Sequence, residues 1–189
     1  MEKNKLVAVD LDGTLIDTTK VNYFAYKKAL EEKGFTVTLE YYTDECYGKY
    51  YLDFLPQLMG ENPERQLVEA VHERKKQIYA SCASYGERND ALYEILKSLK
   101  ASGEWYTALV TTGSARNSEE ILRAFDCYDL FDLILTSENI KNNKPDPEGY
   151  IMAMENFRIS PENTVIFEDS LTGMQAAVAS GATVFKVKL

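Results

Sequence analysis

Five short apolar runs constrain the fold of this 189-residue chain more than any other feature. They are rich in Val, Ile, Leu and Thr, and they lie at residues 6–10, 106–111, 131–136, 164–169 and 183–187. Each run is nearly continuous rather than alternating, which is typical of strands buried on both faces of a parallel sheet.

Amphipathic segments separate the later runs. One carries apolar residues at helical spacing over 91–99 and ends before Gly103, and another follows the N-cap candidate Ser114 over 115–125. Two more cover 147–157, opening with Pro147, and 171–180. This alternation predicts an α/β fold with a doubly wound, Rossmann-like parallel sheet.

Almost a hundred residues separate the first run from the second, far more than one crossover needs. The insert is rich in helical patterns, which predict helices at 18–33 and at 62–79, the latter with Asn62 as its cap. We therefore expect a catalytic α/β core formed by 1–17 and 86–189, and a small helical domain at 18–85. Nine of the thirteen tyrosines fall in this insert, and most are expected to fill its core.

Charge and composition exclude several functional classes. With 45% hydrophobic and 27% charged residues the chain is an ordinary globular protein. A net charge of −9 disfavours nucleic acids and anionic membrane surfaces as partners. We see no run of about 20 apolar residues that could span a membrane and no signal-peptide core.

The cysteines and the one histidine exclude further kinds of functional site. Cys46, Cys82 and Cys127 are widely spaced and form no CxxC unit, so we expect buried, reduced thiols in a cytoplasmic protein. A single histidine, His72, leaves almost no material for a Ser–His–Asp triad or a His-rich metal site. Since His72 lies in a charged helical run, we expect it on a solvated face.

Polar residues follow the apolar runs where a parallel sheet binds its ligands, at the carboxyl ends of the strands. They occur as Asp10-Leu11-Asp12-Gly13-Thr14, Thr111-Thr112-Gly113-Ser114, Lys144-Pro145-Asp146-Pro147 and Glu168-Asp169-Ser170. The sequence therefore predicts two carboxylate pairs, a hydroxyl-bearing loop and one lysine at a single edge.

Such a cluster favours phosphoryl transfer. Four carboxyl groups close together would resist ionisation unless a cation joined them, and oxygen ligands suit Mg²⁺. A loop with Thr111 and Gly113 that opens onto a helix N-terminus can hold an anion, and Lys144 adds a positive charge. A metal, an anion cradle, a lysine and a free carboxylate together indicate transfer of a phosphoryl group to an aspartate.

The segments DLDGTL, the strand-ending Thr111, KPDP and EDSLTG resemble the four motifs of the haloacid dehalogenase-like (HAD) hydrolase superfamily. The resemblance extends from Leu6 to about Gly181, and the insert lies where that superfamily carries a helical C1 cap. It implies that Asp10 is the nucleophile that forms an aspartyl-phosphate and that Asp12 is the general acid and base. It also implies that Lys144 and Thr111 hold the phosphoryl group, with substrate contacts from the neighbouring loop at Thr112 and Gly113.

The resemblance further implies Mg²⁺ bound by Asp10, the Asp12 carbonyl and Asp169, with Glu168 as a nearby ligand or a partner of the ligands. The haloacid dehalogenases themselves lack a carboxylate two residues after the nucleophile, so Asp12 favours phosphate chemistry over halide chemistry. We therefore expect a monomeric, Mg²⁺-dependent phosphatase that hydrolyses a small phosphorylated metabolite.

Other functions are weighed against this one. Asn22 and Lys49 are candidate substrate contacts in the insert. Relatives that are β-phosphoglucomutases place a His near Asn22 and an Arg close to Tyr51, and the absence of both favours hydrolysis over a mutase. A phospho-acceptor domain without turnover and a non-catalytic binding protein are the remaining alternatives. The leaving group, whether a sugar, an organic acid or a nucleoside, stays open.

Overall fold

The computed structural model describes residues 3–189, which separate into two compact units. The first unit contains the chain up to Asp17 and Arg88–Leu189, and the second contains Thr18–Glu87. Two short paired strands, β2 (Ile16–Asp17) and β3 (Glu87–Arg88), mark the passages of the chain between them. Each unit is described separately below.

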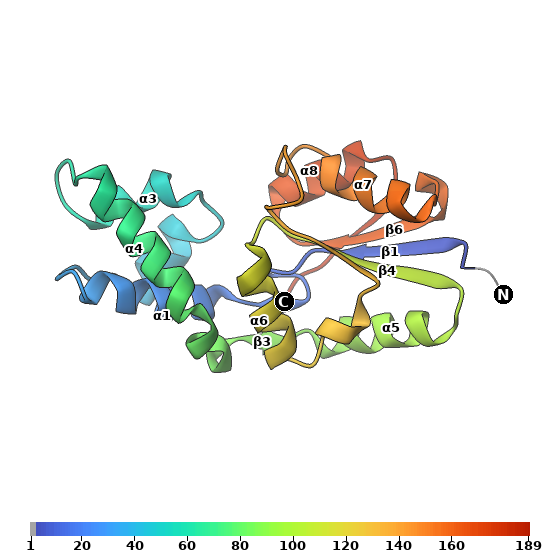
Figure 1. The fold of residues 1–189 in the computed structure, drawn as a ribbon, viewed down its shortest axis with the longest axis horizontal. Helices are drawn as coiled ribbons and strands as arrows, with labels where there is room; N and C mark the ends of the chain where they lie inside the picture. Colours follow the sequence, from blue (N-terminus) through green and yellow to red (C-terminus); the bar gives the residue numbers. More distant parts are fainter. Residues whose placement is uncertain (1–2) are drawn as a thin grey trace. The chain divides into compact units, whose positions relative to one another are not determined.

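The first unit is built on a parallel five-stranded sheet (Figure 1). Its strands are β1 (Lys5–Val9), β4 (Trp105–Val110), β5 (Leu133–Leu135), β6 (Thr164–Glu168) and β7 (Thr183–Lys186), in the order β5-β4-β1-β6-β7. The chain runs outward from β1 to β4 and β5, and then crosses to β6 and β7 on the other side. This reversal beside β1 is the position where doubly wound sheets bind ligands, and the predicted fold class is confirmed.

Helices cover both faces of this sheet. Helices α7 (Glu148–Phe157) and α8 (Leu171–Ala179) lie on one face, and α5 (Asp90–Ala101) and α6 (Ala115–Ala124) lie on the other (Figure 1). Three of the four begin at a residue whose side chain accepts a backbone N–H, namely Asn89, Ser114 and Ser170. Short 3₁₀ turns at Tyr128–Leu130 and Pro161–Asn163 complete the connections.

The core between the sheet and α7/α8 explains why these segments fold together. Its buried residues come from the strands and from the inward faces of the two helices: Leu6, Ala8, Ala108, Val110, Ile166, Tyr150, Ala153, Ala176 and Ala177. Small alanines on α8 and α7 bring the helix backbones close to the sheet. The ends of the strands are thereby held at fixed spacing.

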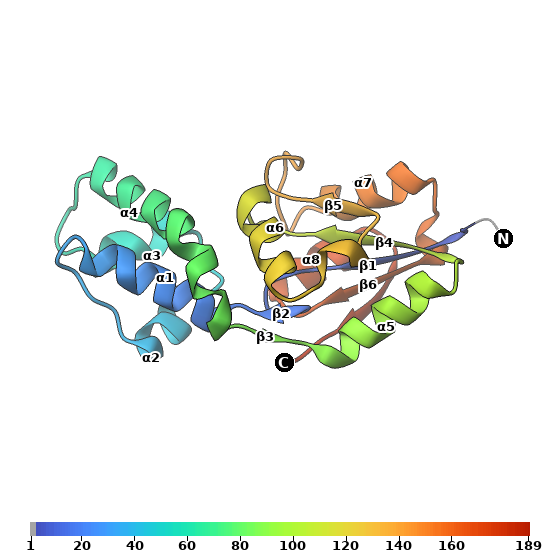
Figure 2. The same cartoon turned by 60° about the horizontal axis from the view of Figure 1, so that its bottom comes forward.

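The second unit is helical, and both views show its helices grouped together (Figure 2). Its elements are α1 (Thr19–Glu31), α2 (Leu39–Tyr41), a π-helical turn (Tyr42–Cys46), α3 (Tyr51–Leu58), α4 (Arg65–Ile78) and a 3₁₀ segment (Tyr79–Tyr85). Helix α1 packs against α4, and the core between them is aromatic, with Tyr23, Tyr26, Tyr42 and Phe54 buried. Tyrosines therefore do fill this core, as the sequence suggests.

Two details of the insert differ from the sequence-based prediction. Asn62 does not cap a helix: it has a φ of +52°, the chain is still extended at Glu64, and α4 begins at Arg65. Helix α3 was not predicted, because it is only eight residues long and contains Pro56.

The prediction of a solvated His72 is wrong. Its ring stacks on Tyr51 with centroids 3.8 Å apart, and its Nδ1 lies 2.8 Å from the Tyr26 hydroxyl. Burial, assisted by the charges of Lys75 and Lys76, lowers the pKa of His72 to about 4. The histidine is thus a half-buried, neutral ring packed against the aromatic core.

The cysteines behave as predicted, since Cys46, Cys82 and Cys127 are buried and free. Among the described residues, no helix combines the length and the apolar character that crossing a bilayer requires.

Candidate active site

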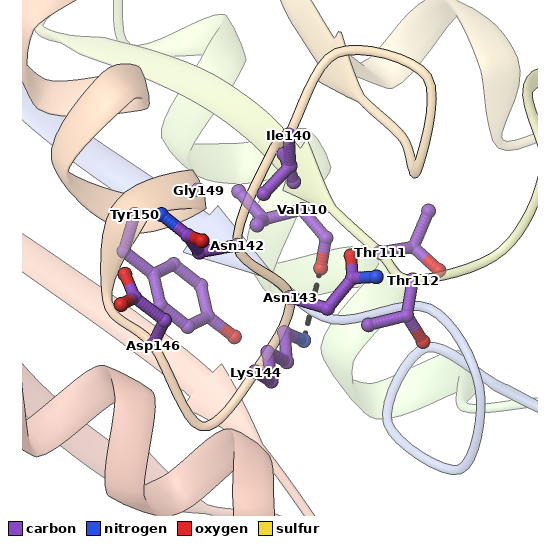
Figure 3. Close-up of a pocket in the computed structure, with 10 residues that line it drawn as sticks. All are labelled: Val110, Thr111, Thr112, Ile140, Asn142, Asn143, Lys144, Asp146, Gly149 and Tyr150. Atoms are coloured by element: carbon purple, nitrogen blue, oxygen red, sulfur yellow. Dashed lines mark hydrogen bonds between the residues drawn. The ribbon is translucent and has the colours of Figure 1, made fainter. Parts of the chain in front are cut away.

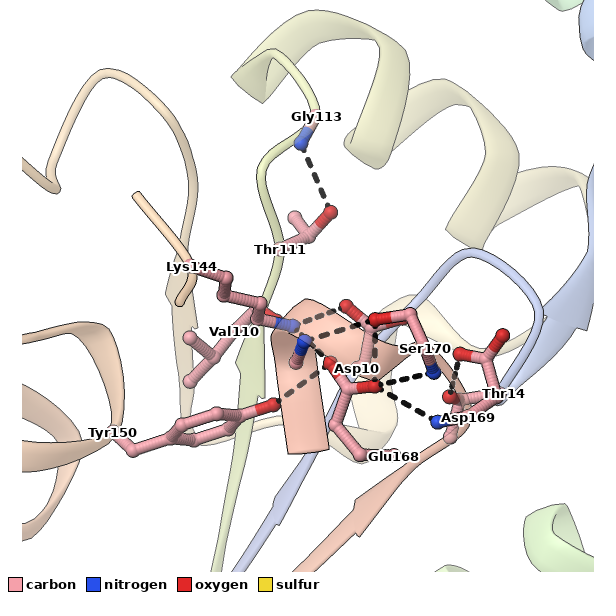
Figure 4. Close-up of polar contacts among 11 residues, drawn as sticks. Asp10, Thr14, Val110, Thr111, Gly113, Lys144, Tyr150, Glu168, Asp169 and Ser170 are labelled. Atoms are coloured by element: carbon pink, nitrogen blue, oxygen red, sulfur yellow. Dashed lines mark hydrogen bonds and ion pairs between the residues drawn. The ribbon is translucent and has the colours of Figure 1, made fainter. Parts of the chain in front are cut away.

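The polar residues predicted to converge meet at the carboxyl edge of the sheet (Figure 4). Asp10 directly follows β1, Thr111 follows β4, and Glu168 is the last residue of β6. Lys144 reaches the same point from the loop between β5 and α7. Parallel pairing of β1 with both β4 and β6 brings these residues, far apart in sequence, to one place.

The ammonium of Lys144 is the centre of the cluster. It donates to Asp10 Oδ1 at 2.5 Å, to Glu168 Oε1 at 2.6 Å and to the Val110 carbonyl at 3.0 Å. All three ammonium protons therefore have acceptors, although the side chain is only 8% exposed. Burial alone would lower the pKa of Lys144, but the charges of Asp10 and Glu168 raise it above its ordinary value.

Asp10 is a buried carboxylate whose ionisation is finely balanced. Burial raises its pKa to about 7, Lys144 opposes that rise, and the charges of Glu168 and Asp12 reinforce it. A second cation beside Asp10 would therefore favour the ionised, nucleophilic form.

Glu168 is fully buried and all of its lone pairs are engaged. Its Oε1 accepts from Lys144 and from the Tyr150 hydroxyl at 3.2 Å, and its Oε2 accepts from the Asp169 N–H, the Ser170 N–H and the Ser170 hydroxyl. Helix α8 leaves room for this carboxylate only because residue 173 is glycine: a Cβ there would lie 1.7 Å from Oε1. Glu168 is consequently a fixed anchor for Lys144.

Asp169 is held beside Asp10 by the loop after β1. The Thr14 hydroxyl donates to Asp169 Oδ1 at 2.7 Å, and a Cβ on Gly13, whose φ is +88°, would lie 2.4 Å from Asp169 Oδ2. Burial, together with the Glu168 charge, raises the pKa of Asp169.

One oxygen each from Asp10, Glu168 and Asp169 lie within 4.8 Å of one another, a grouping that could hold a metal ion. This donor set of carboxylates fits a hard divalent cation such as Mg²⁺. Gly13 and Asp169 also lie too close together for residue 13 to carry a side chain.

Thr111 and the start of α6 form another part of the candidate active site. Thr111 is 1% exposed, and its hydroxyl accepts the Gly113 N–H at 3.0 Å. A Cβ on Gly113 would lie 3.3 Å from Thr111 Oγ1 and 3.9 Å from Asp12 Oδ2, so the Asp12 carboxylate faces this loop. Asp12 also adds to the electrostatic field on Asp10, which places it at the same edge.

Thr112 and Lys144 line a small hollow together with Asn142, Asn143 and Tyr150 (Figure 3). The last three were not singled out from the sequence. The two asparagines immediately precede Lys144, so their position in the motif was the available signal. Tyr150 lies about one helical turn beyond the Lys144–Pro147 motif, and nothing in the sequence marked it as a site residue.

The remaining candidates, Asn22 and Lys49, belong to the second unit. The Asn22 amide donates to the carbonyl and the hydroxyl of Thr18, and Lys49 forms an ion pair with Glu45 at 3.3 Å. Their contacts are local to that unit.

Comparison with known proteins identifies the family of this chain. Residues 7–187 match the family model described as haloacid dehalogenase-like hydrolase. The chain is 32% identical to a phosphorylated carbohydrates phosphatase of Thermotoga maritima, over 93% of this chain and 81% of that protein. It is 31% identical to a phosphoglycolate phosphatase of Nitrosospira multiformis, over 97% and 82% of the two chains.

The fold is also found among solved structures. CbbY from Rhodobacter sphaeroides, in complex with phosphate, superposes with a TM-score of 0.84 over 98% of this chain and 87% of that one, at 23% identity.

Proposed function

The chain belongs to the haloacid dehalogenase-like hydrolase family, and we propose that it is a Mg²⁺-dependent phosphatase that hydrolyses a small phosphate monoester through an aspartyl-phosphate. The observation that carries the proposal is the Lys144 ammonium, which joins Asp10 and Glu168 at the carboxyl edge of the sheet. Relatives named as phosphatases of phosphorylated carbohydrates and of phosphoglycolate support a small phosphorylated substrate.

The first half of the reaction uses Asp10 and Asp12. An Asp10 carboxylate oxygen attacks phosphorus, the ester P–O bond breaks, and Asp12 gives its proton to the departing oxygen. The products of this half are the free alcohol and phosphorylated Asp10. Lys144 and the Thr111 loop offset the charge of the phosphoryl oxygens during transfer.

The second half returns the enzyme to its starting state. Asp12, now a carboxylate, takes a proton from water, and the water oxygen attacks phosphorus. The bond between phosphorus and Asp10 breaks, which releases inorganic phosphate and restores both carboxyl groups. Asp12 is placed for both roles because its carboxylate lies beside the Thr111–Gly113 loop.

The carboxylates that would hold Mg²⁺ are Asp10 and Asp169, with the Asp12 carbonyl. When bound, the ion would supply positive charge that offsets the repulsion between the phosphate and the surrounding carboxylates. Glu168 faces donors with both oxygens, so we assign it mainly to holding Lys144 and the Asp169 backbone.

We assign Thr18–Glu87 as a helical cap that supplies substrate specificity, with Asn22 and Lys49 as its candidate contacts. Replacing either by Ala should raise KM more than it lowers kcat. The three free, buried cysteines support action in the reducing cytoplasm.

A panel of phosphate esters, assayed with Mg²⁺ for phosphate release, tests the proposed function. Wild type should release phosphate from at least one small ester, and Asp10→Asn should release none while remaining folded. A phosphorylated protein that never turns over would instead indicate a phospho-acceptor, and equal activity of the two proteins would refute the nucleophile.

A further inference from the structure

Tyr150 is a buried side chain that contacts two members of the candidate active site, Glu168 and Lys144. It lies in α7 and is 1% exposed, and its hydroxyl donates to Glu168 Oε1 at 3.2 Å. The Lys144 ammonium lies over its ring, 5.1 Å from the centroid. Figure 4 shows the Tyr150 hydroxyl reaching the Glu168 carboxylate.

The first turn of α7 fixes this tyrosine in place. A Cβ on Gly149 would lie 2.7 Å from Val110 Cγ1 and 2.8 Å from Ile140 Cδ1, so the helix backbone is in close contact with β4 and with the loop between β5 and α7. Val110 also provides the carbonyl that binds Lys144. The positions of Tyr150 and the ammonium are therefore set by the same strand.

Two carboxylates compete for the Lys144 ammonium. Its distances to Asp10 Oδ1 and Glu168 Oε1 are almost equal, at 2.5 and 2.6 Å. A second donor on Oε1 shares its negative charge and weakens its attraction for the ammonium. The only side-chain hydroxyl that donates to Oε1 among the described residues is that of Tyr150.

We infer that Tyr150 is a positioning residue: by donating to Glu168 Oε1 it keeps the Lys144 ammonium shared with Asp10, where the phosphoryl group is to be bound. The inference rests on the proposed function. Without the hydroxyl, Oε1 would bind Lys144 alone, and the ammonium would move toward Glu168 and away from the reacting carboxylate.

Tyr150→Phe keeps the ring and removes only the hydroxyl. We expect kcat to fall about 10-fold, the effect of weakening one hydrogen bond to a charged group, with KM changed less than about 2-fold. The matched control is Tyr106→Phe, which removes a hydroxyl from the same core at the amino end of β4 and should leave both constants unchanged.

A second measurement does not depend on activity. In protein labelled with ¹⁵N-lysine, the ammonium resonance of Lys144, assigned by its loss in Lys144→Gln, should shift in Tyr150→Phe and stay in place in Tyr106→Phe. In a Glu168→Gln background, which removes the competing charge, Tyr150→Phe should shift it no further. A tyrosine that only fills space would produce no shift in either background, and a hydroxyl that acts on Lys144 directly, without Glu168, would produce the same shift in both; either result overturns the inference.

The outcomes separate the two proposals. If wild type hydrolyses no ester, the proposed function fails, while the resonance still tests the placement of Lys144. If Tyr150→Phe retains wild-type kcat, or leaves the Lys144 resonance unmoved, the inference is overturned.

Discussion

The two units bury lysines of similar exposure in opposite ways. In the first unit, the Lys144 ammonium binds two carboxylates and a carbonyl. In the second, Lys75 is 8% exposed and its ammonium lies over the rings of Tyr79 and Tyr26, 4.5 and 5.2 Å from their centroids. The first arrangement concentrates opposite charges, and the second places an ammonium over polarisable rings.

This contrast shows where each unit can do chemistry. Burying Asp10 and Glu168 together costs free energy unless Lys144 offsets it, which is a cost that proteins bear at reactive sites. The second unit buries aromatic rings and packs a half-buried, neutral histidine against them, which suits a structural core rather than a reactive site. The following experiments test that division, from the largest expected effect to the smallest.

Replacing each buried lysine by Met should give very different results. Lys144→Met should lower kcat by about 10³-fold and the free energy of unfolding by about 3–5 kcal/mol, because it leaves two buried carboxylates without their cation. Lys75→Met should cost about 2 kcal/mol, the value of a desolvated cation–π contact, and leave kcat unchanged. Steady-state assays and urea denaturation measure both, and a folded but inactive Lys75→Met protein would break the comparison.

Glycines of the two units should also respond differently. Gly173→Ala must displace the Glu168 carboxylate, so we expect about 3 kcal/mol of destabilisation and a large loss of kcat. Gly34→Ala, in the second unit, has a φ of +81° but no atom within 4 Å of its Cβ, and should cost only about 1 kcal/mol of backbone strain. Thermal denaturation of the two variants distinguishes them, and equal Tm values would contradict the close packing around Glu168.

Mg²⁺ should stabilise the first unit through Asp10 and Asp169. At a concentration about 100-fold above its Kd, the ion should add about 2.7 kcal/mol to the free energy of unfolding. Asp169→Asn should lose most of this gain. A Tm that rises equally in wild type and in Asp169→Asn would place the ion elsewhere.

His72 should make the second unit sensitive to acid. Its pKa is about 4 in the folded chain and 6.5 for an ordinary histidine, so the unfolded chain binds more protons between these values. Stability should therefore fall as the pH drops from 6.5 to 4, by about 1 kcal/mol once partial solvent screening is allowed for. His72→Gln should show a shallower pH dependence over this range, and identical slopes would contradict a neutral imidazole held against the aromatic core.

Much of the first unit could be predicted from its sequence because local pattern and tertiary structure agree there. Continuous apolar runs gave the strands, and the positions of Asp10, Lys144 and Glu168 after or near strand ends followed from the topology. The partners of these groups could not be predicted in this way. Tyr150 reaches Glu168 only because α7 packs closely on β4, and such packing has no signature in a single sequence.

The second unit was predicted less well. Charged neighbours of His72 suggested an exposed helix face, but Tyr26 and Tyr51 cover the ring from other helices. Pro56 argued against a helix at α3, although the residues of this short helix complete the aromatic core. Tertiary contacts overrode local pattern in both cases.

The most direct test of the account is to trap the phosphorylated enzyme. Wild type is mixed with Mg²⁺ and an ester from the panel that it hydrolyses, and the reaction is quenched in acid. Mass spectrometry should then find one phosphoryl group on the peptide that contains Asp10. Borohydride reduction should convert that residue to homoserine. A phosphoryl group on any other residue, or turnover by Asp10→Asn at the wild-type rate, would contradict the assignment of Asp10 as the nucleophile.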